Sequence, residues 1–230
     1  IGYAIAKKLS QNDCKVVITG RNIETLERVA SELGKNVLPM VWNAMDFDKA
    51  NEKIAQAADM LGGLDIVVNN AGIFAQRYEW DKHELLKTTP REWSDVITVN
   101  ASAVFFTMQA AVNYMLEHHI KGNILNVTSV TGEEPVYGAY GGSKILARGW
   151  GKMFAADGIT INGIAPGPVA TEMSNWHEGD SMKCARIPYG RFVTIDEIAG
   201  LAMYLLDEKA KMVCGETVII DGAYSIRGAE

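Results

Sequence analysis

The stretch Leu64-Asp-Ile-Val-Val-Asn-Asn-Ala-Gly72 is a short apolar run that ends abruptly in turn-forming residues. Such a run, bounded by turn residues, is typical of a buried β-strand. Five comparable runs occur elsewhere, at Lys15–Thr19, Val37–Trp42, Gly122–Thr128, Ile159–Ala165 and Thr217–Ile220. Because these runs are largely apolar throughout, they predict parallel strands that are covered on both faces.

Helical patterns separate the predicted strands. They cover Ile1–Ser10, Ile23–Leu33, Asp48–Leu61, Arg91–His119, Tyr140–Ala156 and Ile195–Leu206, and the pair His118-His119 suits the negative end of a helix dipole. Alternating strands and helices with short links predict right-handed crossovers between parallel strands. The predicted fold class is therefore α/β, a doubly wound parallel sheet in one domain over residues 1–230.

The longest stretch without a regular pattern runs over residues 171–193. A loop of this length in a compact domain is usually functional. We therefore expect a lid over the substrate within this segment.

Composition and charge exclude several classes of function. The 230 residues are 48% hydrophobic and 22% charged, as in a globular domain, and the net charge of −6 includes no basic stripe for nucleic acid. Cys14, Cys184 and Cys214 lack the paired spacing of zinc sites or disulfide frameworks, which favours a reducing cytoplasm. The four histidines lie in no ligand cluster, so no metal is expected. No run reaches the ~18 apolar residues of a membrane span.

The motif Tyr140-Gly-Gly-Ser-Lys144 points to proton chemistry. On a helix, the i, i+4 spacing places the phenol and the ammonium on one face. A neighbouring cation favours the phenolate, which makes Tyr140 a usable acid or base near neutral pH. Taken alone, this spacing is common on exposed helices.

Six motifs in order resemble the classical short-chain dehydrogenase/reductase family along nearly the whole chain. They are Asn69-Asn-Ala-Gly72, Asn100 within Thr98-Val-Asn-Ala101, Ser129 within Asn126-Val-Thr-Ser-Val130, the pair Tyr140 and Lys144, Pro166-Gly167 with Thr171, and Gly215 to Gly222. The resemblance implies a Rossmann-type fold and an oxidoreductase that interconverts an alcohol and a ketone by hydride transfer.

The resemblance also implies four catalytic roles. Tyr140 would exchange a proton with the substrate oxygen, and Lys144 would bind the nicotinamide ribose and lower the pKa of the phenol. Ser129 would hydrogen-bond the substrate oxygen, and Asn100 would hold a water molecule that links Lys144 to solvent. Each residue also has a purely structural interpretation, such as a turn cap for Ser129 or a backbone-binding amide for Asn100.

Residues that follow the strands are expected to bind the dinucleotide, because ligands of such sheets lie at the carboxyl ends of the strands. The predicted cofactor-binding residues are Ile1, Gly2, Arg21, Asn22, Asn43, Ala44, Asn70, Ala71, Gly72, Tyr140, Lys144, Pro166, Gly167, Val169 and Thr171. Arg21 stands where NAD-selective enzymes usually carry an acidic residue, and a guanidinium can bind a 2′-phosphate. This favours NADP and leaves NAD open, as Arg21 could instead be a surface cation.

The glycine-rich phosphate loop of the family is represented only by Ile1-Gly2. We therefore expect that roughly 10 to 20 native residues, enough for a first strand and a tight loop, are absent from this chain.

The substrate stays open among sugar acids, hydroxysteroids and 3-oxoacyl compounds, although Trp80, Tyr137, Met173 and Trp176 could line an apolar pocket. The alternatives to an oxidoreductase are a non-catalytic dinucleotide-sensing or scaffold protein and an epimerase or dehydratase with tightly held cofactor. The resemblance implies a homo-tetramer or homo-dimer built on the helices after Pro90 and after Tyr140. Neither nucleic acid nor membrane is an expected partner.

Overall fold

The computed structural model describes residues 1–74, 86–132, 148–171, 174, 177, 180 and 184–226. Its strands are β1 (Val16–Gly20), β2 (Val37–Val41), β3 (Ile66–Asn69), β4 (Asn123–Val127), β5 (Thr160–Pro166) and β6 (Thr217–Ile220). Its α-helices are α1 (Gly2–Gln11), α2 (Ile23–Leu33), α3 (Ala50–Leu61), α5 (Pro90–Ile97), α6 (Ala103–Glu117), α8 (Arg148–Phe154) and α10 (Ile195–Leu206). All six predicted strands are confirmed, with ends shifted by at most two residues.

Every strand pairing within the named strands is parallel, as the sequence predicts. The strands form two blocks, β1–β2 and β3–β4–β5–β6. Within the described residues no strand joins β1 to β3. That residues 1–230 form one domain stays a prediction.

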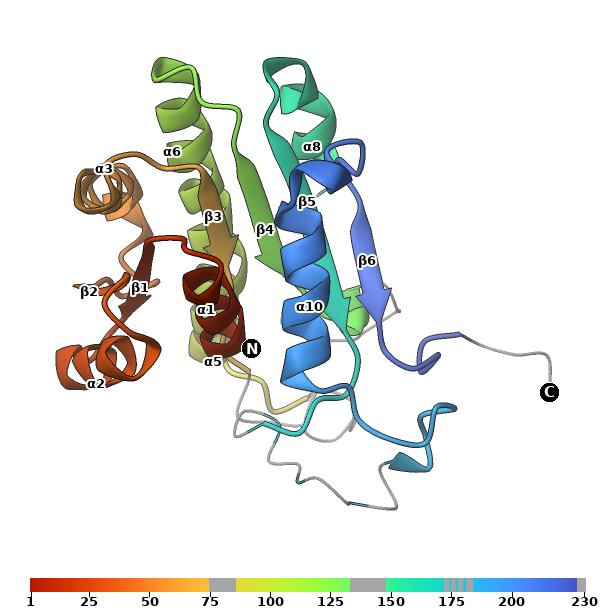
Figure 1. Ribbon diagram of the computed structural model, residues 1–230. Helices are drawn as coiled ribbons and strands as arrows, with labels where there is room; N and C mark the ends of the chain where they lie inside the picture. The colour runs from red at the N-terminus through yellow and green to blue at the C-terminus, as the bar shows by residue number, and fades with distance from the viewer. Residues whose placement is uncertain are drawn as a thin grey trace.

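Helices cover both faces of the sheet (Figure 1). Because neighbouring strand residues point to opposite faces, Ile124 and Leu125 of β4 enter different cores. Ile124 packs with α3 and α6, whereas Leu125 packs with α1 and α10. Both side chains are only 1% exposed, so β4 is buried on both faces as its apolar sequence predicts.

The predicted continuous helix over Arg91–His119 is wrong in its middle. A π-helical turn, η2 (Thr98–Ser102), separates α5 from α6. Apolar periodicity cannot show this insertion of one residue into a turn, and such turns are frequent at functional sites. The helix ends at Glu117, and His118 caps it with its Nδ1 atom 2.9 Å from the Tyr114 carbonyl oxygen, which confirms the predicted place of the histidine pair at a helix end.

The helix Pro90–Glu117 is long and apolar enough, by length and composition alone, to cross a membrane. The sequence expectation concerned an unbroken apolar run of about 18 residues, and polar residues such as Asn100 and Gln109 interrupt this helix. Half of its apolar window is buried inside the protein, as in the core helix of a globular fold.

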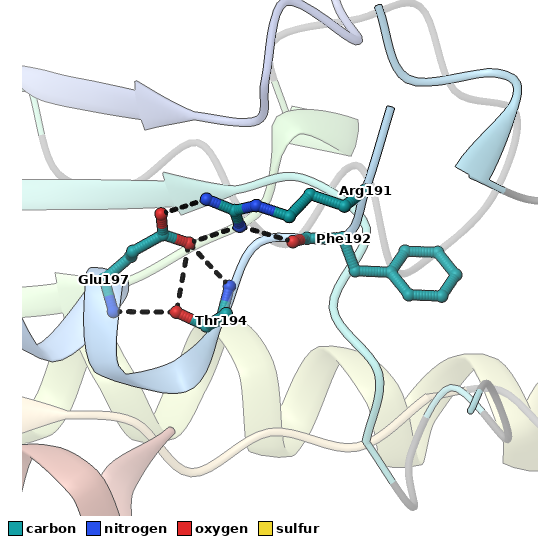
Figure 2. A network of polar contacts seen from close by, with 4 residues as sticks. All are labelled: Arg191, Phe192, Thr194 and Glu197. Atoms are coloured by element: carbon teal, nitrogen blue, oxygen red, sulfur yellow. Dashed lines mark hydrogen bonds and ion pairs between the residues drawn. The ribbon is translucent and has the colours of Figure 1, made fainter. Parts of the chain in front are cut away.

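A polar network fixes the chain at the start of α10 (Figure 2). Thr194 and Glu197 form a capping box, in which each side chain binds the backbone N–H of the other residue. Arg191 donates to both carboxylate oxygens of Glu197, at 2.9 and 2.6 Å, and to the Phe192 carbonyl oxygen at 3.0 Å. The network therefore ties the end of segment 171–193 to α10.

We expect Glu197→Gln to change the acid dependence of stability. Hydrogen bonds from Arg191 and Thr194 lower the pKa of the Glu197 carboxyl to about 2, from 4.5. Because the folded-state pKa is the lower one, the carboxylate stabilises the fold above pH 4.5, and this contribution is lost as pH falls from 4.5 towards 2. The free energy of unfolding measured in urea should therefore be lower for Glu197→Gln than for wild type at pH 6, and this difference should narrow near pH 2. A difference in unfolding free energy that does not change with pH would contradict this expectation. The matched control is Glu27→Gln, at an exposed position of α2.

Candidate functional site

Many of the predicted site residues that the structure describes lie at or beyond the carboxyl ends of the strands. All strands run in one direction, so these ends meet at the lower edge of the sheet in Figure 1. Arg21 directly follows β1, Asn70 directly follows β3, and Ser129 is the second residue after β4. This is the edge where ligands of doubly wound folds bind.

Asn100 clamps the loop that follows β3. Its Oδ1 accepts a hydrogen bond from Ile73 N at 2.8 Å, and its Nδ2 donates to Ile73 O at 2.8 Å. The side chain is 2% exposed and belongs to the π-helical turn η2. Its amide thus pairs with the backbone N–H and carbonyl oxygen of Ile73, which directly follows the predicted cofactor residues Asn70, Ala71 and Gly72. The water relay that the resemblance implies for Asn100 stays a prediction.

A second contact links the Asn70 loop to the start of α1. A Cβ atom on Gly2 would lie 2.6 Å from Nδ2 of Asn70, so only glycine fits at this position without a shift. The first turn of α1 thus lies against the loop after β3. Free N–H groups at a helix start favour an anion, which suits a pyrophosphate held beside Ile1 and Gly2.

Ser129 lies in a fixed loop after β4. Thr128, just before it, donates to the Ile164 carbonyl oxygen through its backbone N–H (2.7 Å) and its Oγ1 (2.9 Å). The Ser129 Oγ accepts from Thr131 N at 3.3 Å and from Thr131 Oγ1 at 3.0 Å. Thr131 was not among the site residues predicted from the sequence, although a second hydroxyl two residues after the candidate serine was a usable signal.

The loop after β5 packs against a buried carboxylate. Gly167 N donates to Ile220 O at 2.9 Å, and a Cβ on Gly167 would lie 2.5 Å from the Cβ of Asp221. Asp221 is 6% exposed and accepts from Ala223 N and Ser225 N, each at 2.8 Å. Asp221 therefore fixes the turn beside Pro166 and Gly167, a role that the sequence analysis did not assign.

The remaining residues of this loop are held by both ends of segment 171–193. Val169 forms an isolated parallel bridge with Val193. Ser174 Oγ donates to the carbonyl oxygen of Val169 at 2.9 Å and accepts from Thr171 N at 3.1 Å. These contacts place Val169 and Thr171 at the base of segment 171–193, and the lid itself stays a prediction.

Arg21 is an exposed cation at the end of β1. In the part of the chain that the structure describes, no carboxylate pairs with it. Its neighbour Asn22 caps α2 by accepting from Thr25 N at 2.9 Å. Asn43, followed by Ala44, accepts from Met45 N at 3.2 Å, and its amide oxygen retains a second lone pair.

Several predicted residues lie outside the described ranges. They are the catalytic pair Tyr140 and Lys144 and the candidate pocket residues Trp80, Tyr137, Met173 and Trp176. Of the four predicted catalytic residues, the structure therefore places Asn100 and Ser129. Among the described residues, no group of three or more His, Cys, Asp or Glu could hold a metal ion.

Comparison with known proteins decides the family. The sequence profile described as enoyl-(acyl carrier protein) reductase matches residues 1–225. The chain belongs to the short-chain dehydrogenase/reductase family. It is 31% identical to gluconate 5-dehydrogenase of Gluconobacter oxydans, over 98% of this chain and 91% of that enzyme. It is also 31% identical to the 3-oxoacyl-[acyl-carrier-protein] reductase FabG of Thermotoga maritima, over 98% of this chain and 94% of that enzyme.

The fold agrees with that of the family. The structure of a 3-ketoacyl-(acyl-carrier-protein) reductase from Brucella melitensis, complexed with NADH, is similar with a TM-score of 0.88. It shares 25% sequence identity, and the match covers 98% of this chain and 93% of that one. The Rossmann-type α/β fold is thereby confirmed, and the chain is a short-chain NAD(P)-dependent oxidoreductase.

Proposed function

We propose that this short-chain oxidoreductase interconverts a secondary alcohol and a ketone, with Tyr140 as the general acid and base. The observation that carries the proposal is that Ser129 and the Asn100-clamped loop follow the neighbouring parallel strands β4 and β3, at one edge of the sheet. A strand-end hydroxyl beside a rigid loop can hold a substrate oxygen in a fixed position.

The described residues fit a dinucleotide. Gly2 leaves room for close approach to Asn70, the start of α1 has no side-chain cap on its N–H groups, and Arg21 pairs with no carboxylate among the described residues. When bound, the nicotinamide supplies or accepts the hydride. Ser129 donates a hydrogen bond to the substrate oxygen, Tyr140 exchanges a proton with that oxygen, and Lys144 favours the phenolate of Tyr140.

We infer that NADP is the preferred cofactor, because Arg21 is free to bind the 2′-phosphate bidentately. Arg21→Ala is expected to raise the Kd for NADPH about 10- to 100-fold, the value of one or two charge-assisted hydrogen bonds, and to leave the Kd for NADH nearly unchanged. Fluorescence titration of both nucleotides measures this. The matched control is Arg28→Ala, since Arg28 is paired with Glu32 at 2.6 Å on α2. Equal losses for NADPH and NADH would contradict the assignment.

The substrate class is tested with compounds that the relatives' names suggest. Gluconate with NADP⁺, and 5-keto-gluconate and a 3-oxoacyl thioester with NADPH, form the panel, and absorbance at 340 nm follows turnover. Turnover of one of them would support the proposal. Tight NADPH binding with no turnover would instead favour the non-catalytic dinucleotide-sensing alternative.

We further infer that two or four copies assemble through the helices after Pro90 and after Tyr140, in the cytoplasm. An aromatic band supports this choice, formed by the rings of Phe47, Phe106, Phe105, Trp150 and Phe154 at successive centroid distances of 5.1, 5.3, 5.1 and 5.7 Å. The band crosses α6 and α8, and Phe106 is 38% exposed. Partly exposed aromatic side chains are typical anchors of protein interfaces.

Phe106→Lys is therefore expected to weaken assembly at least about tenfold, because a charge would replace an aromatic anchor. Sedimentation velocity at micromolar concentration measures the change. Ile23→Lys, at an exposed position of α2, should leave the assembly unchanged. A wild-type chain that sediments as a monomer would contradict the inference.

A further inference from the structure

Thr131 contributes two hydrogen bonds to the candidate catalytic serine. It lies in the short 3₁₀ turn η3 (Val130–Gly132), and its N–H and Oγ1–H both donate to the Ser129 Oγ, at 3.3 and 3.0 Å. Val130 between them is 3% exposed, and Thr128 before them is bonded to β5. The buried side chain of Val130 and the hydrogen bonds from Thr128 to β5 therefore hold the Ser129–Thr131 pair in place.

The direction of these bonds has a chemical consequence. A serine hydroxyl has two acceptor lone pairs and a single proton. Both donors come from Thr131, so the acceptor capacity of Ser129 is taken and its own proton is left to donate. Among the described residues, no group accepts a hydrogen bond from the Ser129 hydroxyl. A serine in this state can donate to a substrate oxygen and cannot compete as an acceptor.

We propose that Thr131 is a positioning residue that directs the Ser129 hydroxyl proton towards the substrate oxygen. The proposal rests on the proposed function, in which Ser129 donates to that oxygen. The backbone N–H of Thr131 alone would make an ordinary serine turn, and many residues could supply it. The hydroxyl of Thr131 is the part that the turn does not require, so its removal isolates the positioning role.

The experiment is a double-mutant cycle over Ser129→Ala and Thr131→Val, measured as steady-state reduction of the panel ketones with NADPH. Thr131→Val keeps the side-chain shape and the backbone N–H but removes the Oγ1–H donor. We expect it to lower kcat about tenfold, with KM and the Kd for NADPH changed less than about twofold. Thr131→Ser keeps the hydroxyl and should retain most of the wild-type kcat.

The decisive arm is the double variant. Ser129→Ala is expected to lower kcat about 100-fold, and adding Thr131→Val should lower it no further, because Thr131 acts through Ser129. The matched control is Ser31→Ala, which removes an exposed hydroxyl from α2 that makes no contact with Ser129, and its kcat should stay within about twofold of wild type.

Two kinds of result would overturn the inference. A wild-type kcat in Thr131→Val, or the same fractional loss with and without Ser129, would show that Thr131 does not act through the serine. A wild-type chain that turns over no ketone of the panel would overturn the proposed function, and this inference with it. The two failures are distinguishable, because only the second abolishes wild-type turnover.

Discussion

Tyr140→Phe is expected to lower kcat about 10²- to 10⁴-fold, the usual contribution of a positioned acid or base. The substitution removes only the phenolic oxygen, so the Kd for NADPH should change little. Tyr140 lies outside the described residues, and the expectation rests on its motif with Lys144 and on family membership. Stopped-flow reduction of a panel ketone measures the chemical step directly.

The control for Tyr140 is a tyrosine without a catalytic role. Tyr204→Phe, at a 51% exposed position of α10, should leave kcat unchanged. Equal turnover in wild type and Tyr140→Phe would remove Tyr140 from the mechanism. A large increase in the Kd for NADPH would instead show that the tyrosine mainly binds cofactor.

Asn100→Ala is expected to lower the free energy of unfolding by about 2–4 kcal/mol. The substitution leaves both the N–H and the carbonyl oxygen of Ile73 without their partner, and each unsatisfied group costs about 1–3 kcal/mol. The loop after β3 should loosen as well, so the Kd for NADPH should rise. Urea unfolding and fluorescence titration measure the two effects.

Two variants sharpen the Asn100 experiment. Asn100→Asp can still accept from Ile73 N but cannot donate to Ile73 O, so it should also be destabilised. Asn113→Ala removes an exposed amide from the same helical stretch and should change stability by less than about 0.5 kcal/mol. If the Asn100→Ala chain were as stable as wild type, the two hydrogen bonds between Asn100 and Ile73 would not stabilise the fold as we infer.

The sequence predicted the strands well, because doubly buried strands carry a strong local signal. Ile124 and Leu125 illustrate this, since an apolar pair pointing to opposite faces requires cover on both. The ends of the strands then placed Arg21, Asn70 and Ser129 at one edge without any tertiary information.

The contacts that connect distant segments were not predictable from pattern alone. The amide of Asn100 binds Ile73, 27 residues away, and the π-helical turn that contains Asn100 has no signature in apolar spacing. Asp221 beside Gly167 and Arg191 on Glu197 depend likewise on how loops meet after folding. Thr131 is different, because its spacing from Ser129 was visible in the sequence and only its hydrogen bonds required the structure.

Deuterium transfer from the cofactor to a ketone tests whether this chain catalyses hydride transfer. NADPH deuterated at nicotinamide C4, in separate samples for each face, is incubated with the chain and with 5-keto-gluconate or a 3-oxoacyl thioester, and the alcohol is analysed by mass spectrometry. We expect an alcohol that carries one deuterium from a single face of the nicotinamide. We expect this deuterated alcohol to be lost in Tyr140→Phe. Bound NADPH with no deuterated alcohol from either ketone would contradict the oxidoreductase assignment and favour a dinucleotide-sensing protein.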